Sequence, residues 1–192
     1  MNTGDNMRII AGSLRGRQIK ALSGDNTRPT SDKIKENIFN MLGQFFDHGQ
    51  ALDLFAGSGN LGFEAISRGM EKAVLIDINP AAIRIIKDNV NILKLTDQVT
   101  VYRNDAFRAL TILAKNAEQF DLIFLDPPYG KIKITDLLTQ IIAGDLLAEA
   151  GFVMCEFDAG QLVSYDQQQL EVVRRETYGM IEILILQKKV AV

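Results

Sequence analysis

The sequence predicts an α/β protein with a Rossmann-like, doubly wound and mainly parallel sheet. From about residue 50 onward, short apolar runs alternate with longer segments in which apolar residues recur every three or four positions. This alternation is typical of βαβ units, whose parallel strands are joined by helices. Near-continuous apolar runs such as LIFL indicate strands that are covered on both faces. The apolar runs span residues 51–55, 73–78, 99–102, 120–126 and 151–157.

Helices are expected between these strands, and a different pattern follows the last of them. Residues 171–179 and 180–189 are two strand-like runs with only a short glycine-containing connection. They predict an antiparallel hairpin that closes one edge of the sheet. The helical segments span residues 63–69, 81–95, 107–117 and 136–147.

The N-terminal region predicts a small β-hairpin and a helix ahead of the sheet. Residues 7–22 have the pattern of a short hairpin, and a helix follows Pro29 with Thr30, Ser31 or Asp32 as its cap. The spacing on this helix predicts a buried stripe of Ile34, Ile38, Met41, Leu42 and Phe45, with Lys33, Lys35, Glu36 and Asn40 facing elsewhere.

Length and composition indicate a soluble globular protein. The chain has 192 residues, of which 47 % are hydrophobic and 23 % are charged. No apolar run approaches the roughly 18 residues that a membrane-spanning helix needs, and no secretory signal is visible, so we expect a cytoplasmic protein. Cys155 is the only cysteine and lies in an apolar run, which favours a buried core residue over a nucleophile. We divide the chain into an N-terminal unit, residues 1–48, and a core domain, residues 49–192.

The net charge of −3 conceals a basic N-terminal segment. Residues 1–40 contain seven basic and four acidic side chains, whereas the rest of the chain carries a net negative charge. From charge alone, an ordinary solvated surface is the better interpretation. If a polyanion binds, we expect it to contact this basic segment.

A glycine turn predicts a ligand site after the first strand of the sheet. The strand is expected to end at Phe55, and a helix is expected to begin near Asn60. Gly57 and Gly59 allow a tight turn and let a ligand approach the backbone closely. The N-terminus of the helix suits an anionic ligand group. The same glycines, with Gly62, also match the fingerprint of dinucleotide-binding folds.

Three acidic residues favour S-adenosylmethionine as the ligand of this site. Asp53 lies just before the turn, where its carboxylate can accept from an ammonium group, and Asp77 is placed to bond the ribose hydroxyls. Asp105 can accept from the adenine amino group. Each acid alone also suits a turn or a helix cap, but together they follow three successive strands, where ligands of open α/β sheets bind. The candidate cofactor-binding residues are Asp53, Phe55, Ala56, Gly57, Gly59, Asp77, Ile78, Asp105 and Ala106.

The motif DPPY at residues 126–129 predicts the transfer site. Asp126 follows the fourth strand and precedes a proline, which holds it in extended geometry. Its carboxylate and the Pro127 carbonyl can accept the two hydrogens of an exocyclic base amine, and Tyr129 offers a face for an extruded base. A rigid exit from the strand is the structural alternative. The candidate catalytic residues are Asp126, Pro127, Pro128 and Tyr129.

The order of these motifs carries a family resemblance. DLFAGSG followed by DPPY resembles the branch of Rossmann-like methyltransferases that modify adenine N6 or guanine N2. MRIIAGSLRGRQI, RPTSDKIKENIFNML and the two motif regions together resemble the RsmD-type 16S ribosomal RNA guanine-N2 methyltransferases. The sequence departs from the usual pattern at Asn60, where a small residue is more common, and at Asp77, where many relatives have Glu.

The resemblance implies methyl transfer from S-adenosylmethionine to one guanine N2 of small-subunit rRNA, on an assembled or assembling particle. It implies that the basic side chains of the leader position the RNA backbone. We expect no metal, because the sulfonium is the electrophile and His48 is the only histidine. We also expect a monomer, although the sequence leaves the oligomeric state open. The candidate RNA-binding residues are Arg8, Arg15, Arg17, Arg28 and Lys33.

Three other functions stay open at this point. An adenine-N6 methyltransferase acting on DNA or RNA would use the same DPPY residues. An NAD-dependent oxidoreductase would use the glycine pattern. A catalytically silent RNA-binding factor would use the basic N-terminus alone.

Overall fold

A computed structural model of the chain describes residues 7–22, 31–128, 130 and 132–190. The described strands are β1 (Met7–Arg8), β2 (Gln18–Ile19), β3 (Gln50–Asp53), β4 (Lys72–Asp77), β5 (Val99–Arg103), β6 (Phe120–Leu125), β7 (Leu147–Asp158), β8 (Leu170–Tyr178) and β9 (Ile181–Lys188). The described helices are α1 (Asp32–Leu42), α2 (Asn60–Ser67), α3 (Pro80–Leu93), α4 (Ala106–Lys115) and α5 (Ile134–Ala143).

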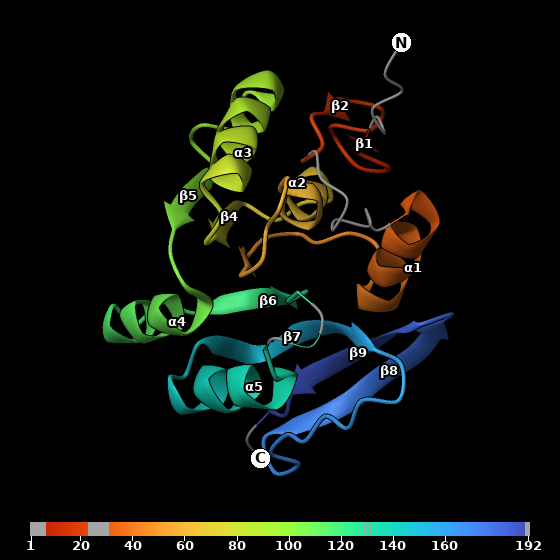
Figure 1. The fold of residues 1–192 in the computed structure, drawn as a ribbon, viewed down its shortest axis with the longest axis vertical. Helices are drawn as coiled ribbons and strands as arrows, with labels where there is room; N and C mark the ends of the chain where they lie inside the picture. The colour runs from red at the N-terminus through yellow and green to blue at the C-terminus, as the bar shows by residue number, and fades with distance from the viewer. Residues whose placement is uncertain (1–6, 23–30, 129, 131, 191–192) are drawn as a thin grey trace.

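The main sheet has seven strands in the order β5-β4-β3-β6-β7-β9-β8 (Figure 1). Strands β3 to β7 pair in parallel, and β9 is antiparallel to both β7 and β8. The doubly wound, mainly parallel sheet is therefore confirmed. The C-terminal hairpin closes one edge as expected, and its second strand, β9, inserts between β7 and β8. The N-terminal hairpin is a separate antiparallel pair of β1 and β2.

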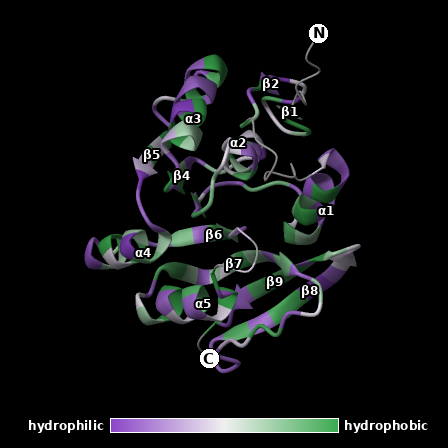
Figure 2. Ribbon diagram, in the orientation of Figure 1, coloured by the Kyte–Doolittle hydropathy of each residue, from purple (hydrophilic) through white to green (hydrophobic). Residues whose placement is uncertain are grey.

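Helices cover both faces of the sheet and bury two hydrophobic clusters. One cluster lies under α1, α2 and α3, and the other lies under α4 and α5. In Figure 2, α3 and α5 alternate between hydrophobic and hydrophilic colours, as expected for helices with one buried face. Cys155 is fully buried in the second cluster, as predicted, and burial raises the pKa of its thiol.

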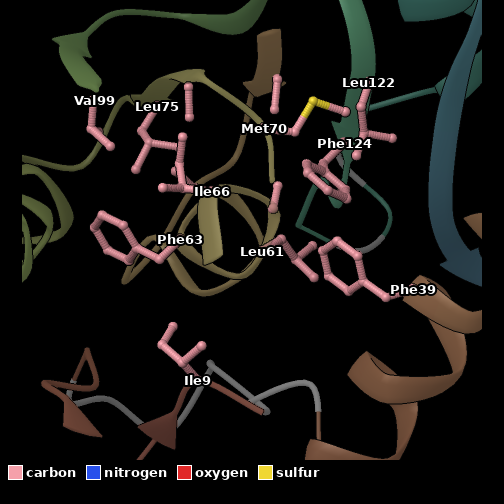
Figure 3. Close-up of a cluster of buried hydrophobic side chains, with 14 of the residues drawn as sticks. Ile9, Phe39, Leu61, Phe63, Ile66, Met70, Leu75, Val99, Leu122 and Phe124 are labelled. Atoms are coloured by element: carbon pink, nitrogen blue, oxygen red, sulfur yellow. The ribbon is translucent and has the colours of Figure 1, made fainter. Parts of the chain in front are cut away.

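The N-terminal hairpin and α1 share the first cluster with the sheet. Ile9 and Phe39 are fully buried, and they pack with Phe63 of α2 and Phe124 of β6 (Figure 3). The rings of Phe39 and Phe124 lie 5.9 Å apart between centroids. The hairpin and α1 therefore pack on the core, and the domain boundary at residue 48 stays a prediction. Among the described residues, no helix is long and apolar enough to cross a membrane.

Two predicted element ends are wrong. The first strand of the sheet ends at Asp53 rather than Phe55, because its regular pairing with β4 and β6 stops there, although single hydrogen bonds from Leu54 to Phe124 and from Ala56 to Ile76 follow. The helix predicted over residues 136–147 ends at Ala143. Leu147 begins β7 instead, so its apolar side chain is buried from a strand and not from a helix.

The predicted faces of α1 are partly wrong. The side chain of Phe45 is 60 % exposed, because the helix ends at Leu42 and Gly43 adopts a left-handed conformation with φ of 111°. Helical periodicity therefore does not extend to residue 45. Lys35, which was expected to face away from the core, is only 1 % exposed. Ser31 caps the helix, within the range that the sequence predicted.

Lys35 is buried because its ammonium group finds polar partners inside the molecule. Its Nζ donates to the Arg8 carbonyl at 2.7 Å and to Asn60 Oδ1 at 2.6 Å, and it lies 3.3 Å from the Glu64 carboxylate. Glu64 also accepts from the backbone N–H groups of Ile10 and Ala11. This network attaches the N-terminal hairpin and α1 to the start of α2.

Candidate active site

The carboxyl ends of three adjacent strands bring the predicted site residues together. Asp53 ends β3, Asp77 ends β4, and Asp126 directly follows β6. The three strands are parallel neighbours with β3 in the middle. Their last residues therefore lie at one edge of the sheet, where open α/β sheets bind ligands.

The turn after β3 depends on glycine for two different reasons. Gly57 has a φ of +55°, and a Cβ at this residue would meet no other atom within 4 Å, so it would point into open space. Gly59 has a φ of +86°, and a Cβ there would come within 2.3 Å of the Phe63 ring. The first glycine therefore leaves room beside the backbone, and the second permits the close packing of the turn on α2.

Asp77 holds the glycine turn in place. Its Oδ2 accepts from the Gly57 N–H at 2.9 Å, and its Oδ1 accepts from the Asn79 N–H at 2.8 Å. Each oxygen keeps a further lone pair with which it can accept from a ligand hydroxyl. The neighbouring Ile78 is 62 % exposed and offers an apolar surface at the same edge.

Asp53 is a buried carboxyl group with a strongly shifted pKa. Its side chain is 2 % exposed. Burial raises its pKa to about 7, hydrogen bonding from the Phe55 backbone opposes the rise, and the charge of Asp77 adds to it. A cationic ligand group beside Asp53 would stabilise the ionised form. The site therefore fits an ammonium group.

Asp105 acts as a helix cap in this structure. It is the N-cap residue of α4, and its Oδ1 accepts from the Arg108 N–H at 3.1 Å. The helix-cap interpretation of Asp105 is therefore confirmed, and its contact with adenine stays a prediction. Ala106 is buried in the first turn of α4.

Phe55 is half-buried against the second cluster, and Ala56 donates its N–H to the Ile76 carbonyl at 2.9 Å.

Asp126 is half-buried next to other carboxylates. Burial raises its pKa well above the usual range, and the charges of Glu156 and then Asp53 raise it further. Pro127 is buried, and Pro128 is exposed. Tyr129 lies outside the described residues, so its predicted stacking role has no structural account.

Glu156 belongs to the site, and the sequence reasoning missed it. It lies on β7, one residue beyond the pair Leu125 and Cys155 that joins β6 to β7. Its side chain is 5 % exposed. The signal was a charged residue near the end of an otherwise apolar strand, GFVMCEF, beside the strand that leads into DPPY.

Comparison of the whole sequence with known families gives a match over most of the chain. A family model described as conserved hypothetical protein 95 matches residues 7–187. The chain belongs to this family, the RsmD family of methyltransferases.

Relatives from two bacteria illustrate the membership in the RsmD family. YlbH of Bacillus subtilis (strain 168), an rRNA methyltransferase by name, is 48 % identical over 183 residues, which are 95 % of this chain and 100 % of that protein. Ribosomal RNA small subunit methyltransferase D of Haemophilus influenzae is 37 % identical over 128 residues, 67 % of this chain and 66 % of that protein. Among solved structures, yhhF of Escherichia coli, a methyltransferase by name, has a TM-score of 0.83 at 26 % identity and covers 96 % of this chain and 98 % of its own.

The basic residues that the RsmD resemblance assigns to RNA lie on the surface. Arg8 Nε pairs with Asp32 Oδ2 at 2.8 Å, and Arg17 Nη2 donates to the Ile92 carbonyl at 2.8 Å. Arg15 and Lys33 are also exposed. Arg28 lies outside the described residues. RNA contact by these side chains stays a prediction.

A separate cavity of about 500 Å³ lies between β4, β5 and α4. Its walls include Thr100, Tyr102, Ile112 and Asn116, and none of the predicted site residues lines it. Because the carboxylates of the candidate site lie elsewhere, we do not assign the chemistry to this cavity. Among the described residues, no group of three or more His, Cys, Asp or Glu side chains is arranged to hold a metal ion.

Proposed function

We propose that the protein transfers a methyl group from S-adenosylmethionine to the exocyclic N2 amine of a guanine in small-subunit rRNA. The observation that carries this proposal is that Asp126 and Pro127 follow β6 at the same sheet edge where β3 ends in buried Asp53, whose charge acts on Asp126. The name of the Haemophilus influenzae relative supports rRNA as the substrate.

The residues after β3 and β4 fit the donor. When bound, S-adenosylmethionine supplies a methyl group on a positively charged sulfur and leaves as a neutral thioether. In this proposal Asp53, whose pKa is raised by burial, would accept from its ammonium group, and Asp77, which also holds the Gly57 N–H, would accept from its ribose hydroxyls. Gly57 leaves open space beside the backbone, and Ile78 offers an apolar surface for the adenine ring.

Asp126 and Pro127 prepare the target amine. The lone pair of a guanine N2 amine is delocalised into the ring, so the amine is a weak nucleophile. Acceptance of its two hydrogens by the Asp126 carboxylate and the Pro127 carbonyl orients the nitrogen and increases its electron density. The nitrogen gains a methyl group and loses one proton. Asp126 is suited to take that proton because its pKa is raised.

The substrate in this proposal is 16S rRNA within a small ribosomal subunit or an assembly intermediate, and the enzyme acts in the cytoplasm as a monomer. Arg8, Arg15, Arg17 and Lys33 lie on the N-terminal unit, where they would contact the RNA backbone without reading its sequence. The carboxylates of the site then act on the base, and the cationic surface positions the RNA.

Nucleoside mass spectrometry tests the proposal. Ribosomal RNA from cells that lack the protein should lose one N2-methylguanosine, and expression of the intact gene should restore it. Purified protein should restore the same nucleoside in small-subunit particles from those cells. If N6-methyladenine in DNA or RNA is the only product, the substrate base is adenine and not guanine. Binding of NAD⁺ without methyl transfer would overturn it.

A further inference from the structure

Glu156 is a buried carboxylate beside the transfer site that the reaction described above does not use. The ladder between β6 and β7 pairs Phe124 with Met154 and Leu125 with Cys155. Met154 and Phe124 both pack in the cluster under α1, α2 and α3. Side chains alternate along a strand, so Glu156 points to the same face as Met154. Asp53 is paired with Phe124 and also lies on this face.

The charge of Glu156 acts directly on Asp126. Among the charged groups that raise the pKa of Asp126, Glu156 has the larger effect and Asp53 the smaller one. Glu156 also lines a narrow pocket together with Pro127, Pro128 and Gln161. A carboxylate whose charge acts on Asp126 and which borders the same pocket as Pro127 is a candidate for contact with a base that these two residues hold.

Guanine and adenine differ in what they present next to the reactive amine. In guanine, the ring nitrogen N1 beside the N2 amine carries a hydrogen, so the amine and its neighbour N1 are both donors. In adenine, the ring nitrogen N1 beside the N6 amine carries a lone pair and is an acceptor. An ionised carboxylate only accepts hydrogen bonds. It stabilises the guanine edge and repels the adenine edge.

We propose that Glu156 is the specificity-determining residue of the transfer site and selects guanine by accepting from its N1–H while Asp126 and Pro127 hold the N2 amine. This inference rests on the proposed function and adds to it a reason for the choice of base. The wild-type protein should therefore methylate 2-aminopurine poorly, because this analogue keeps the exocyclic 2-amine and lacks the N1 hydrogen.

The experiment compares two substrates in the same RNA. Small-subunit RNA with either guanine or 2-aminopurine at the methylated position is assembled into particles, and initial rates of methyl transfer are measured. Wild type should prefer guanine by about tenfold or more, since 2-aminopurine cannot donate a hydrogen bond from N1 to the Glu156 carboxylate. In Glu156→Gln, the amide can donate to N1 of 2-aminopurine, so the preference should fall by about tenfold or more.

Glu182→Gln is the matched control. Glu182 is a buried carboxylate on β9 with 6 % exposure. It forms an ion pair with Arg175 and is not among the groups that shift the pKa of Asp126. Its substitution should leave the preference unchanged. A second variant, Glu156→Asp, keeps the carboxylate on a side chain that is one methylene shorter. Its preference for guanine over 2-aminopurine should lie between those of wild type and Glu156→Gln. Thermal unfolding and titration with S-adenosylhomocysteine establish that each variant is folded and binds the cofactor product.

The outcomes separate this inference from the function on which it rests. If wild type transfers methyl groups to guanine and to 2-aminopurine equally well, Glu156 does not read N1 and the inference fails. The inference also fails if the Gln and Asp variants keep the wild-type preference. If wild type transfers no methyl group to guanine in any particle, the proposed function itself fails.

Discussion

Asp53 is an acidic side chain whose protonation differs strongly between the folded and unfolded chain. Burial raises its pKa to about 7 in the fold, whereas the ordinary value is 3.8. Between these two pH values the folded protein keeps a proton that the unfolded chain has lost. The free energy of unfolding therefore falls as the pH rises through this window, by on the order of 1 kcal/mol per pH unit.

Replacement of Asp53 by Asn should flatten this pH dependence. Urea unfolding at intervals from pH 4 to pH 8 should show a smaller loss of stability in Asp53→Asn than in wild type. Asp97→Asn, a change at an exposed carboxylate, is the control and should keep the wild-type slope. A slope in Asp53→Asn equal to that of wild type would show that Asp53 is ionised across the whole window.

In the proposed function, Asp126 contributes to the chemistry and not to cofactor binding. Asp126→Ala should reduce methyl transfer to small-subunit particles by about 10²-fold or more, because the amine loses the carboxyl group that accepts its hydrogen bond and its proton. Binding of S-adenosylhomocysteine, measured by calorimetry, should persist. Transfer at the wild-type rate would remove Asp126 from the mechanism.

At the scale of elements, the glycine turn between β3 and α2 links stability to ligand binding. Both glycines have positive φ, but only Gly59 is packed against a neighbouring ring. Asp77 at the end of β4 fixes the turn through the Gly57 N–H. The turn is therefore closely packed at its helix end, whereas its strand end is held by Asp77 and borders open space.

Alanine substitutions should distinguish the two ends of the turn. Gly59→Ala should destabilise the fold by about 2 kcal/mol or more, because strain in φ adds to a collision with Phe63. Gly57→Ala should cost about 1 kcal/mol of stability from φ alone and weaken S-adenosylhomocysteine binding by filling the open space. Chemical unfolding and calorimetry measure the two effects. Equal losses of stability would contradict this difference.

The whole molecule is held together by a buried polar network as well as by its two hydrophobic clusters. Glu64 is fully buried and binds Lys35 of α1, Arg68 beyond α2, and the backbone N–H groups of Ile10 and Ala11. Asn89 of α3 joins Lys20 to the carbonyl of Ser58 in the glycine turn. The proposed RNA-contacting unit is thus attached directly to the glycine turn.

Loss of one member of this network should destabilise the whole fold. Lys35→Met should lower the free energy of unfolding by about 3–5 kcal/mol, because it removes one partner of a buried ion pair and leaves Glu64 and Asn60 with fewer contacts. Lys33→Met, on the exposed side of the same helix, should change it by less than about 0.5 kcal/mol. Chemical unfolding measures both variants, and a similar small effect in both would show that the network adds little to stability.

Local patterns were sufficient for the fold class and for most of the candidate site. Alternating apolar runs and helical periods depend on neighbouring residues only, so the parallel sheet followed from them directly. Asp53 and Asp77 were predicted because the ends of parallel strands meet at one edge, and Asp126 was predicted from the DPPY motif that follows the fourth strand. Ser31 lay within the predicted cap range because capping is a local hydrogen bond.

Only the tertiary structure decided which polar side chains are buried and what they contact. Lys35 carries a charge that predicts exposure, yet partners from Arg8, Asn60 and Glu64 make its burial favourable. Glu156 lies near Asp126 because β6 pairs with β7, and this pairing joins residues far apart in the sequence. The sequence alone determined the elements and the edge where they place their ends, because those depend on local chain chemistry. Which side chains contact one another at that edge depends on residues far apart in the chain, so only the folded molecule shows these contacts.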